Sequence, residues 1–499
     1  MCNVNNNYMD YFNQFIKNND WQSFADIIDF SMPIEDIVNK FNEKELELIA
    51  FGLSKHMDLL LKECSEGIKN INYNKRNIQF EKTKLIEMTF INFLNDYIFI
   101  GNIANLLKND KIYSSFAYIN YNLFINGNNI INKIIKKNNN CQINSKLLFE
   151  IKNNFNNAKN CYLAVDIYNS LLNKNKIDLK NLYRYTKVLM KIDNFSINLE
   201  IQKKIFSRTD LKWVINYSQR ISTVKNLFKT VIQIYENELI EKAEKDRFYS
   251  EYIKSKYNLV KCINDYYQSN FKVNELFKSI AVENKKYKLN FISKDLISDI
   301  KEMNNDIIFL LNEFQLPEKE LNKEEIERIA NLELPEKSYD IYYRAGKVRV
   351  LLAKLAVSDI FYLKDRTIEE AIKKFVENIE MAMYMYINVF NIKWQRIKMN
   401  KNDSGGFTYE LEELAFCYSI LGIDNKKYVK EINNLIDKYQ NKKKYARFID
   451  TANFYYALTL IYNKNTKNVT KAIEILSKLK DSKNKYLVKK VESILSDIR

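Results

Sequence analysis

Histidine chemistry is nearly excluded within this chain, because His56 is its single histidine. Catalytic triads use a histidine to move protons between groups, and zinc sites and paired-histidine nuclease sites draw on several such residues. His56 lies in the segment 54–58, which reads Ser-Lys-His-Met-Asp. We interpret it as an ordinary residue on the surface of a helix.

Phosphate-binding and nucleophile motifs are also missing. The chain contains no GxxxxGK loop, no GxSxG elbow and no pair of cysteines at zinc spacing. Gly346 and Lys347 lack the upstream glycine of a phosphate-binding loop, and Gly405 and Gly406 form a loop pair without a dinucleotide fingerprint. The sequence therefore predicts no metal, no cofactor and no enzyme.

The absence of these motifs does not exclude chemistry that is carried out by carboxylates. Glu410, Glu412 and Glu413 follow the glycine pair, and we interpret them as first-turn acids that the helix dipole favours. Asp359 extends an apolar stripe and could be buried beside Arg344 or Arg349. We favour the alternative that Asp359 marks the point where its helix leaves the core. An enzyme built from scattered Glu, Asp, Lys and Tyr side chains is a third hypothesis that no motif supports.

Tyrosine is unusually frequent, at 34 residues. Tyrosine and arginine are enriched at binding hot spots, and aromatic rings beside lysine can stack on single-stranded bases. The alternative is that tyrosine replaces Phe and Leu in the packing of a protein from an AT-rich genome. The candidate partner-binding residues are Tyr342, Tyr343, Arg344, Lys347, Arg349, Tyr384 and Tyr386.

The elements that must position these side chains are predicted to be helices. The chain has only 8 Gly and 3 Pro in 499 residues, and β-proteins need both for turns, bulges and edges. Asn, Asp and Ser can begin helices, and Asn can terminate them, without Gly or Pro. The sequence predicts an all-α fold with essentially no β-structure, as a helical-hairpin solenoid or as stacked helical bundles.

The C-terminal third shows the clearest periodicity. Apolar residues at 341, 345, 348, 352 and 355 follow one helix face. After a turn at 363–366, Thr367 and Glu370 match a capping box at the start of a helix of about 30 residues that ends near Asn400. Residues 402–406 are a loop. Shorter helices are predicted around 411–421, 428–439, 448–460, 469–479 and 486–495, with Gly422 as a C′ residue.

The N-terminal part has a similar but weaker pattern. Residues 96–103 and 116–125 are rich in aromatic and β-branched residues but lack Gly-rich turns on both sides, so we interpret them as helical. The polar tracts 126–129 and 136–140 are predicted loops. Helices are expected around 8–18, 20–30, 43–72, 80–107, 111–126, 144–173, 178–192, 197–206, 220–268 and 291–315.

Charge and proline divide the chain. Pro317 and Pro335 bracket an acidic stretch, so we predict an N-terminal helical domain at 1–316, a linker at 317–337 and a C-terminal helical domain at 338–499. Residues 101–300 carry 33 basic and 18 acidic side chains, within an overall net charge of +16. A basic region attracts nucleic acid, acidic proteins or anionic lipid. We favour the alternative that these lysines solvate the outer helical faces.

Two resemblances follow from the C-terminal helices. Residues 456–462 and 471–476 resemble a degenerate tetratricopeptide unit, in which a small residue such as Ala457 lets two helices approach. Residues 414–422 resemble the first helix of another such unit about 40 residues earlier, longer than the usual period of about 34. The order of helices from Tyr339 to Ile461 also resembles helical bacterial immunity proteins of the PoNe-immunity kind. That resemblance implies binding and masking of a toxin, although inhibitors of basic nucleases are usually acidic.

The remaining features indicate where and how such a chain works. It has no secretory signal and no apolar run of membrane-spanning length, and its six cysteines form no close pairs. These features predict a cytoplasmic protein with reduced thiols and no membrane contact. The favoured hypothesis is a non-catalytic protein-binding scaffold, TPR-like in its C-terminal domain, that serves as an adaptor, regulator or toxin-neutralising protein. The alternative is a nucleic-acid-binding accessory protein that uses the basic region 101–300.

Overall fold

The described part of the chain is helical throughout, which confirms the all-α prediction. A computed structural model describes residues 8–70, 76–137, 144–172, 178–191, 217–236, 242–267, 294–362, 367–399, 406–463 and 468–498. Within these ranges every regular element is a helix and no strand occurs. The expected turn at 363–366, the expected helix at 197–206 and most of the loop at 402–406 lie outside the described residues. No described helix combines the length and apolar character that a membrane crossing requires.

The chain forms two compact units that divide between Leu239 and Ile240. The segment 317–337, where the sequence suggested a linker, belongs to the second unit. There the Asn388 side chain accepts a hydrogen bond from Leu321 N at 3.0 Å and donates one to Lys319 O at 2.7 Å. Helix α16 (Lys323–Asn331), which begins with a capping box at Asn322, lies within the same segment and packs on α18. The proline-bracketed segment is therefore fastened to its unit.

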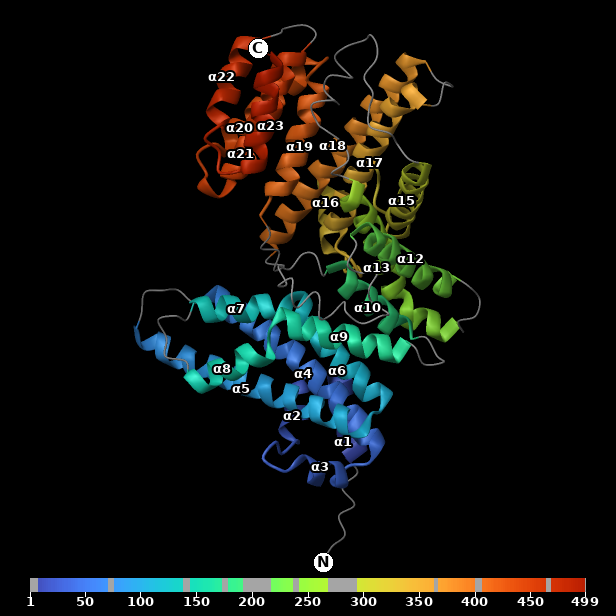
Figure 1. Cartoon of the computed structure of the whole chain (residues 1–499), viewed down its shortest axis with the longest axis vertical. Helices are drawn as coiled ribbons and strands as arrows, with labels where there is room; N and C mark the ends of the chain where they lie inside the picture. Colours follow the sequence, from blue (N-terminus) through green and yellow to red (C-terminus); the bar gives the residue numbers. More distant parts are fainter. Residues whose placement is uncertain are drawn as a thin grey trace, which may run out of the picture. The chain divides into compact units, whose positions relative to one another are not determined.

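The first unit is built around α4, α5 and α6 (Figure 1). Helices α4 and α6 each pack against α5, while α2 packs on α4 and α9 packs on α6. The elements are α1 (Tyr8–Asn18), α2 (Trp21–Asp26), α3 (Ile34–Lys40), α4 (Glu43–Asn70), α5 (Arg76–Leu107), α6 (Asp110–Asn122), η1 (Leu123–Gly127), α7 (Asn128–Lys137), α8 (Ser145–Asn154), α9 (Asn157–Leu172), α10 (Leu179–Lys191) and α12 (Tyr217–Glu236).

The loop expected at residues 126–129 is wrong, because these residues are helical. The π-helical turn η1 runs directly into α7, and the absence of a side chain at Gly127 leaves room for Leu61 of α4. The Asn128 amide then donates to the side-chain oxygens of Asn157 and Asn160 at 3.0 Å each. Asn128, which resembled a loop residue, is thus a buried hydrogen-bonding residue, while Asn126 and Asn129 are exposed on the helix. The expected helix at 144–173 is two helices, which part at Phe155.

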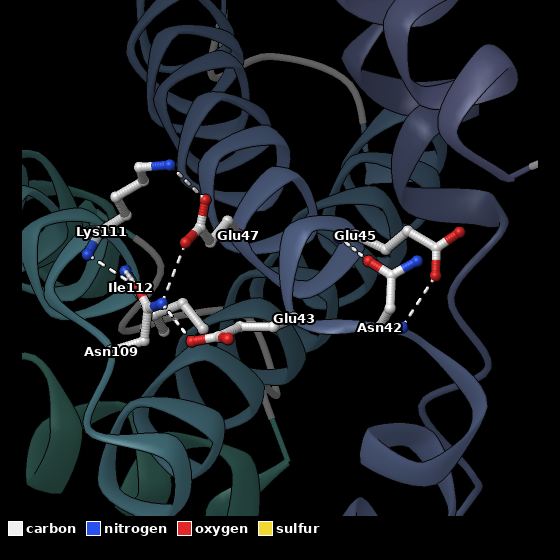
Figure 2. A network of polar contacts seen from close by, with 7 residues as sticks. All are labelled: Asn42, Glu43, Glu45, Glu47, Asn109, Lys111 and Ile112. Carbon is white, nitrogen blue, oxygen red and sulfur yellow. Dashed lines mark hydrogen bonds and ion pairs between the residues drawn. The ribbon is translucent and has the colours of Figure 1, made fainter.

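A polar clasp fixes α4 against the start of α6 (Figure 2). Asn42 and Glu45 exchange hydrogen bonds at the beginning of α4, as in a capping box. Across the contact, Asn109 caps α6 and donates through its amide to Glu43 at 2.7 Å and to Glu47 at 2.9 Å. Lys111 adds an ion pair to Glu47 at 2.6 Å. Asn109 lies in the short turn between α5, which ends at Leu107, and α6, so the clasp holds that turn against α4.

The second unit continues helix by helix along the chain. Successive contacts join α15 to α17, α17 to α18, α18 to α19, α19 to α21 and α21 to α22, and Figure 1 shows α17, α18 and α19 side by side. That this order forms a solenoid remains a prediction. Besides α16, the elements are α13 (Lys242–Tyr267), α15 (Lys294–Glu313), α17 (Ser338–Tyr362), α18 (Ile368–Lys398), α19 (Thr408–Leu421), α20 (Lys426–Tyr439), η5 (Lys443–Tyr445), α21 (Ala446–Tyr462), α22 (Val469–Leu479) and α23 (Lys485–Ile498).

The helix pair α17 and α18 follows the sequence analysis closely. The capping box of Thr367 and Glu370 is confirmed, with both reciprocal hydrogen bonds formed. The two helices cross at Gly346, where a Cβ atom would lie 2.7 Å from the ring of Tyr386. Any side chain at this position would force the buried tyrosine to move. Gly346 therefore serves close helix packing and not a phosphate loop.

Gly422 has a different role from the one expected. It closes α19 as the C-cap with φ −67°, an ordinary helical angle, so the left-handed C′ interpretation is wrong. A Cβ atom here would lie 3.0 Å from Tyr418 O and 3.1 Å from the Thr459 methyl group. Thr459 and Asn463 of the α21 region bind the last carbonyls of α19, at 2.9 Å to Ser419 O and 2.8 Å to Gly422 O. Glycine lets α21 come close enough to cap its neighbour.

Candidate functional site

The seven candidate partner-binding residues lie on α17 and α18, and most of them point into the protein. Tyr342 and Tyr386 have an exposed fraction of 0 %. The Tyr342 hydroxyl donates to Pro317 O at 3.1 Å, while Tyr343 packs on the Tyr386 ring with centroids 5.8 Å apart. Tyr384 lies partly buried against the same apolar core. A partner that docks on the folded chain cannot reach Tyr342 or Tyr386.

The three candidate cations are held in ion pairs within the second unit. Arg344 binds Asp265 of α13 at 2.7 Å, Lys347 binds Glu413 of α19, and Arg349 binds Glu318. Both Arg344 and Lys347 are buried and lie over the Tyr343 ring, at 5.5 and 5.7 Å from its centroid. The structure thus brings Tyr343, Arg344, Lys347 and Tyr386 together, but as an internal electrostatic cluster that ties α17 to its neighbours.

A further buried lysine, which the sequence analysis did not single out, belongs to this cluster. Lys354 lies two turns after Lys347 on α17 and is buried. Burial lowers the pKa of Lys354 to about 8, with a further contribution from the charge of Lys347, while Glu413 acts in the opposite direction. Burial also raises the pKa values of Tyr343, Tyr386 and Cys417 around the same carboxylate. Glu413 is the acidic group that pairs with Lys347 and favours the charged form of Lys354.

The acidic residues at the start of α19 have internal partners. Glu410 lies in the first turn, as the helix-dipole interpretation requires, and is buried in an ion pair with Lys393. Glu412 binds Arg447 of α21 at 3.0 Å. Asp359 lies on α17, but its side chain is outside the described residues. Among the described side chains, no group of three or more His, Cys, Asp or Glu residues is placed to hold a metal ion.

The interpretation of His56 as a surface residue is wrong. His56 on α4 is 2 % exposed and Asp96 on α5 is 1 % exposed, with His56 Nδ1 2.7 Å from Asp96 Oδ2. The Gln22 amide donates to Asp26, which turns its oxygen toward His56 Nε2 at 3.2 Å, so Nε2 must carry a hydrogen. Burial raises the pKa of Asp96 to about 6, against the opposing hydrogen bond from His56.

The inner face of α5 makes a second set of buried polar contacts. The Tyr97 hydroxyl donates to Asn120 Oδ1 of α6 at 3.1 Å, and the Asn160 amide of α9 donates to the same oxygen at 2.8 Å. Phe90, Phe93 and Ile100 on this face are buried around these groups. Because buried polar groups must be paired in one arrangement, this network and the His56–Asp96 pair fix the rotation of α5 about its own axis.

The outer face of α5 has four exposed aliphatic side chains, which makes it the best candidate for a binding surface. Met88, Ile91, Ile98 and Leu106 are between 45 % and 56 % exposed. Helical geometry places them within about 100° of arc, together with the asparagines at 95, 102 and 105. We call this set the α5 outer face. It spans about 27 Å at about 1.5 Å per residue, and its members carry no charge. Glu87, which adjoins Met88 at the azimuth of Asn105, accepts a hydrogen bond from Asn144 N.

The neighbouring helix α8 has an exposed apolar residue of its own. Helix α8 packs on α5, and Asn144 N donates to Glu87 Oε1 at 2.9 Å where α8 begins. Phe149, one turn farther on, is 63 % exposed. Sequence reasoning missed the α5 outer face, because residues 96–103 were examined only for helix or strand. The sequence signal present was the spacing of apolar residues on both faces of one helix, a pattern that is equally typical of a fully buried helix.

Comparison with known proteins gives no relative from which a function could be carried over. No family model matches the chain, and no curated protein matches it. The function must therefore be inferred from the surfaces and contacts described above.

Proposed function

We propose that this chain is a protein-binding helical scaffold whose partner docks on the α5 outer face. The observation that carries the proposal is an exposed helix face with four large aliphatic residues and no charge. Interface cores are depleted in charged residues, and exposed apolar patches of this kind mark interaction sites. The scaffold acts by surface complementarity, as an adaptor, regulator or toxin-neutralising protein of the cytoplasm.

The architecture supports a rigid receptor surface. The inner face of α5 is fixed by the His56–Asp96 pair and by the Tyr97–Asn120–Asn160 network, and the turn that follows α5 is held against α4 by the clasp in Figure 2. A helix held in this way has little backbone freedom left to lose when a partner binds. Affinity then comes from apolar area and not from ordering of the receptor.

The test is a comparison of two charged variants of the full chain. We expect Ile91→Glu/Ile98→Glu to lower the amount of its stoichiometric partner captured from native lysate at least tenfold, because each change places a charge in an apolar contact. The matched control is Val469→Glu/Ile473→Glu, which makes the same kind of change at two exposed residues of α22. Circular dichroism melting checks that both variants fold. Equal capture by the two variants would contradict the proposal.

A further inference from the structure

The second unit contains a pocket of about 410 Å³ that lies where α18, α19 and α20 meet. Helix α19 packs on both of the other helices, and the lining comes from the first half of α18, the last turn of α19 and the beginning of α20. Val376 and Glu380 line the pocket from α18, where their spacing of four residues places both on one side of the helix. A cavity of this volume has the size that is typical of small-molecule sites.

One wall of the pocket is apolar and rigid. Phe375 is 1 % exposed, Ile420 is 3 % exposed and Leu421 is 6 % exposed, and all three belong to the hydrophobic core of the second unit. The core holds these side chains in place. The apolar body of a ligand can therefore displace water from a surface that is already formed, and binding does not require the protein to become ordered.

Carboxylates lie beside this wall. Glu380 and Asp424 both line the pocket, and among the described residues Lys426 is the one cation of the lining. Glu380 is half-buried and forms no ion pair with any described side chain, and it accepts a hydrogen bond from the Tyr428 hydroxyl at 3.4 Å. Lys426 is exposed, and its long stem lets the ammonium group extend into water. Glu380 is therefore a carboxylate that a cationic ligand can pair with.

The tyrosine of the lining also lies in a negative environment. Burial raises the pKa of Tyr428, and the charge of Glu380 adds to this effect. Tyr418 stacks on Tyr428 with ring centroids 6.2 Å apart, and its pKa is raised by burial and then by the charge of Glu431. Lys427, at 5.7 Å from the Tyr428 centroid, is a cation on the same ring. The Tyr428 hydroxyl therefore stays protonated, and its hydrogen bond holds Glu380 at the pocket.

We propose that this pocket, which we call the Glu380 pocket, binds a small organic amine. The ammonium group pairs with Glu380, and the apolar body of the amine covers the wall of Phe375, Ile420 and Leu421. An anion would meet carboxylates, and a neutral apolar ligand would desolvate Glu380 without compensating for its charge. Metal ions that prefer oxygen take about six ligands, more than the carboxylates of this pocket supply. The site is separate from the α5 outer face, and it does not depend on the proposed scaffold function.

The experiment uses the full chain and three probes that share an indole ring with a two-carbon arm. Tryptamine ends in an ammonium group, tryptophol in a hydroxyl group and indole-3-propionate in a carboxylate. We expect ligand-observed NMR titrations to show that tryptamine binds about tenfold more tightly than tryptophol, because a hydrogen bond between charged groups adds to the burial of the shared indole. Indole-3-propionate should bind more weakly than both.

Variants of the lining locate the site. Glu380→Gln should weaken tryptamine binding about tenfold and leave tryptophol binding nearly unchanged, because glutamine keeps the shape but not the charge. The matched control Glu377→Gln removes the same charge at an exposed residue three positions earlier on α18 and should bind tryptamine nearly as the unaltered chain does. Val376→Trp fills the pocket and should abolish the binding of both probes. Circular dichroism melting checks that each variant folds, and the two glutamine variants decide the outcome if Val376→Trp does not fold.

Four results would overturn the proposal. They are no tryptamine binding up to about 10 mM, equal affinities of the unaltered chain for tryptamine and tryptophol, equal losses in the two glutamine variants, and full tryptamine affinity in a folded Val376→Trp variant. Nα-acetyl-lysine methylamide, which carries its ammonium group on a peptide side chain, separates the two sources of an amine. Weaker binding than that of tryptamine supports the proposal, while tighter binding would overturn it, because the pocket would then receive a lysine of a partner protein.

Discussion

Replacing Glu413 with Gln should lower the free energy of unfolding of the second unit by about 3 kcal/mol at pH 7. Glu413 binds Lys347, whose side chain is 7 % exposed, and it is the carboxylate that favours the charged form of Lys354. Glutamine keeps the shape and can still accept a hydrogen bond, but it leaves the buried Lys347 without the negative charge with which it is paired. Breaking a buried pair is costly because the remaining charge is neither solvated nor paired.

The neighbouring residue provides the control. Glu412→Gln removes the same charge one position earlier, but its partner Arg447 is 55 % exposed, so the expected loss is below about 1 kcal/mol. Urea unfolding, followed by the fluorescence of Trp394 in a Trp21→Phe/Trp213→Phe background, reports on the second unit. Equal losses for the two variants would show that Glu413 is an ordinary surface acid.

Replacing Lys354 with Met should have the opposite effect and stabilise the second unit. The pKa of Lys354 falls from the ordinary value of 10.5 to about 8, mainly because the side chain is buried. Between these two pH values the unfolded chain binds more protons than the folded chain, so stability rises with pH across that window. Below pH 8 the folded chain carries the full cost of the buried charge, which corresponds to about 3 kcal/mol.

The pH profile distinguishes this account from simple packing. Lys354→Met should be more stable than the unaltered chain at pH 7, and this difference should shrink through pH 8, 9 and 10 as folded Lys354 loses its charge. Taking the difference at each pH cancels the tyrosine and cysteine titrations that the two proteins share. Lys480→Met, a change at an exposed lysine of α22's end, should leave both level and slope unchanged. A methionine variant that is less stable at pH 7, or a stability difference that stays constant from pH 7 to pH 10, would refute the buried-charge explanation.

Local patterns in the sequence were sufficient to predict much of the fold. The capping box at Thr367 and the apolar stripe of α17 are set by residues three and four apart, and the structure confirms both. The burial and pairing of polar groups were harder to predict, because the partners are distant in the chain. His56 binds a residue 40 positions away and Lys347 one 66 positions away, so neither pairing leaves a periodic signal. Asn128 of the α6–α7 junction resembled a loop residue for the same reason.

The candidate binding residues also show that local sequence patterns do not reveal contacts between distant residues. Tyrosine and arginine on α17 have the composition of a hot spot, yet composition cannot distinguish an interface from a core that contains ion pairs. For the α5 outer face the error was the opposite one, because an exposed surface has the sequence pattern of a core. A helix with apolar residues on both sides reads as fully buried, and only the arrangement of its neighbours reveals that Ile91 and Ile98 are exposed.

The central claim is that the α5 outer face contacts a partner protein, and site-specific photo-crosslinking tests it most directly. A benzophenone amino acid would replace Ile98 in the full chain, with the same replacement at Ile473 of α22 as the control. The account predicts one discrete crosslinked protein from native lysate at position 98, its loss when Ile91→Glu is added, and no such product at position 473. No crosslinked product at position 98, or the same products at both positions, would contradict it.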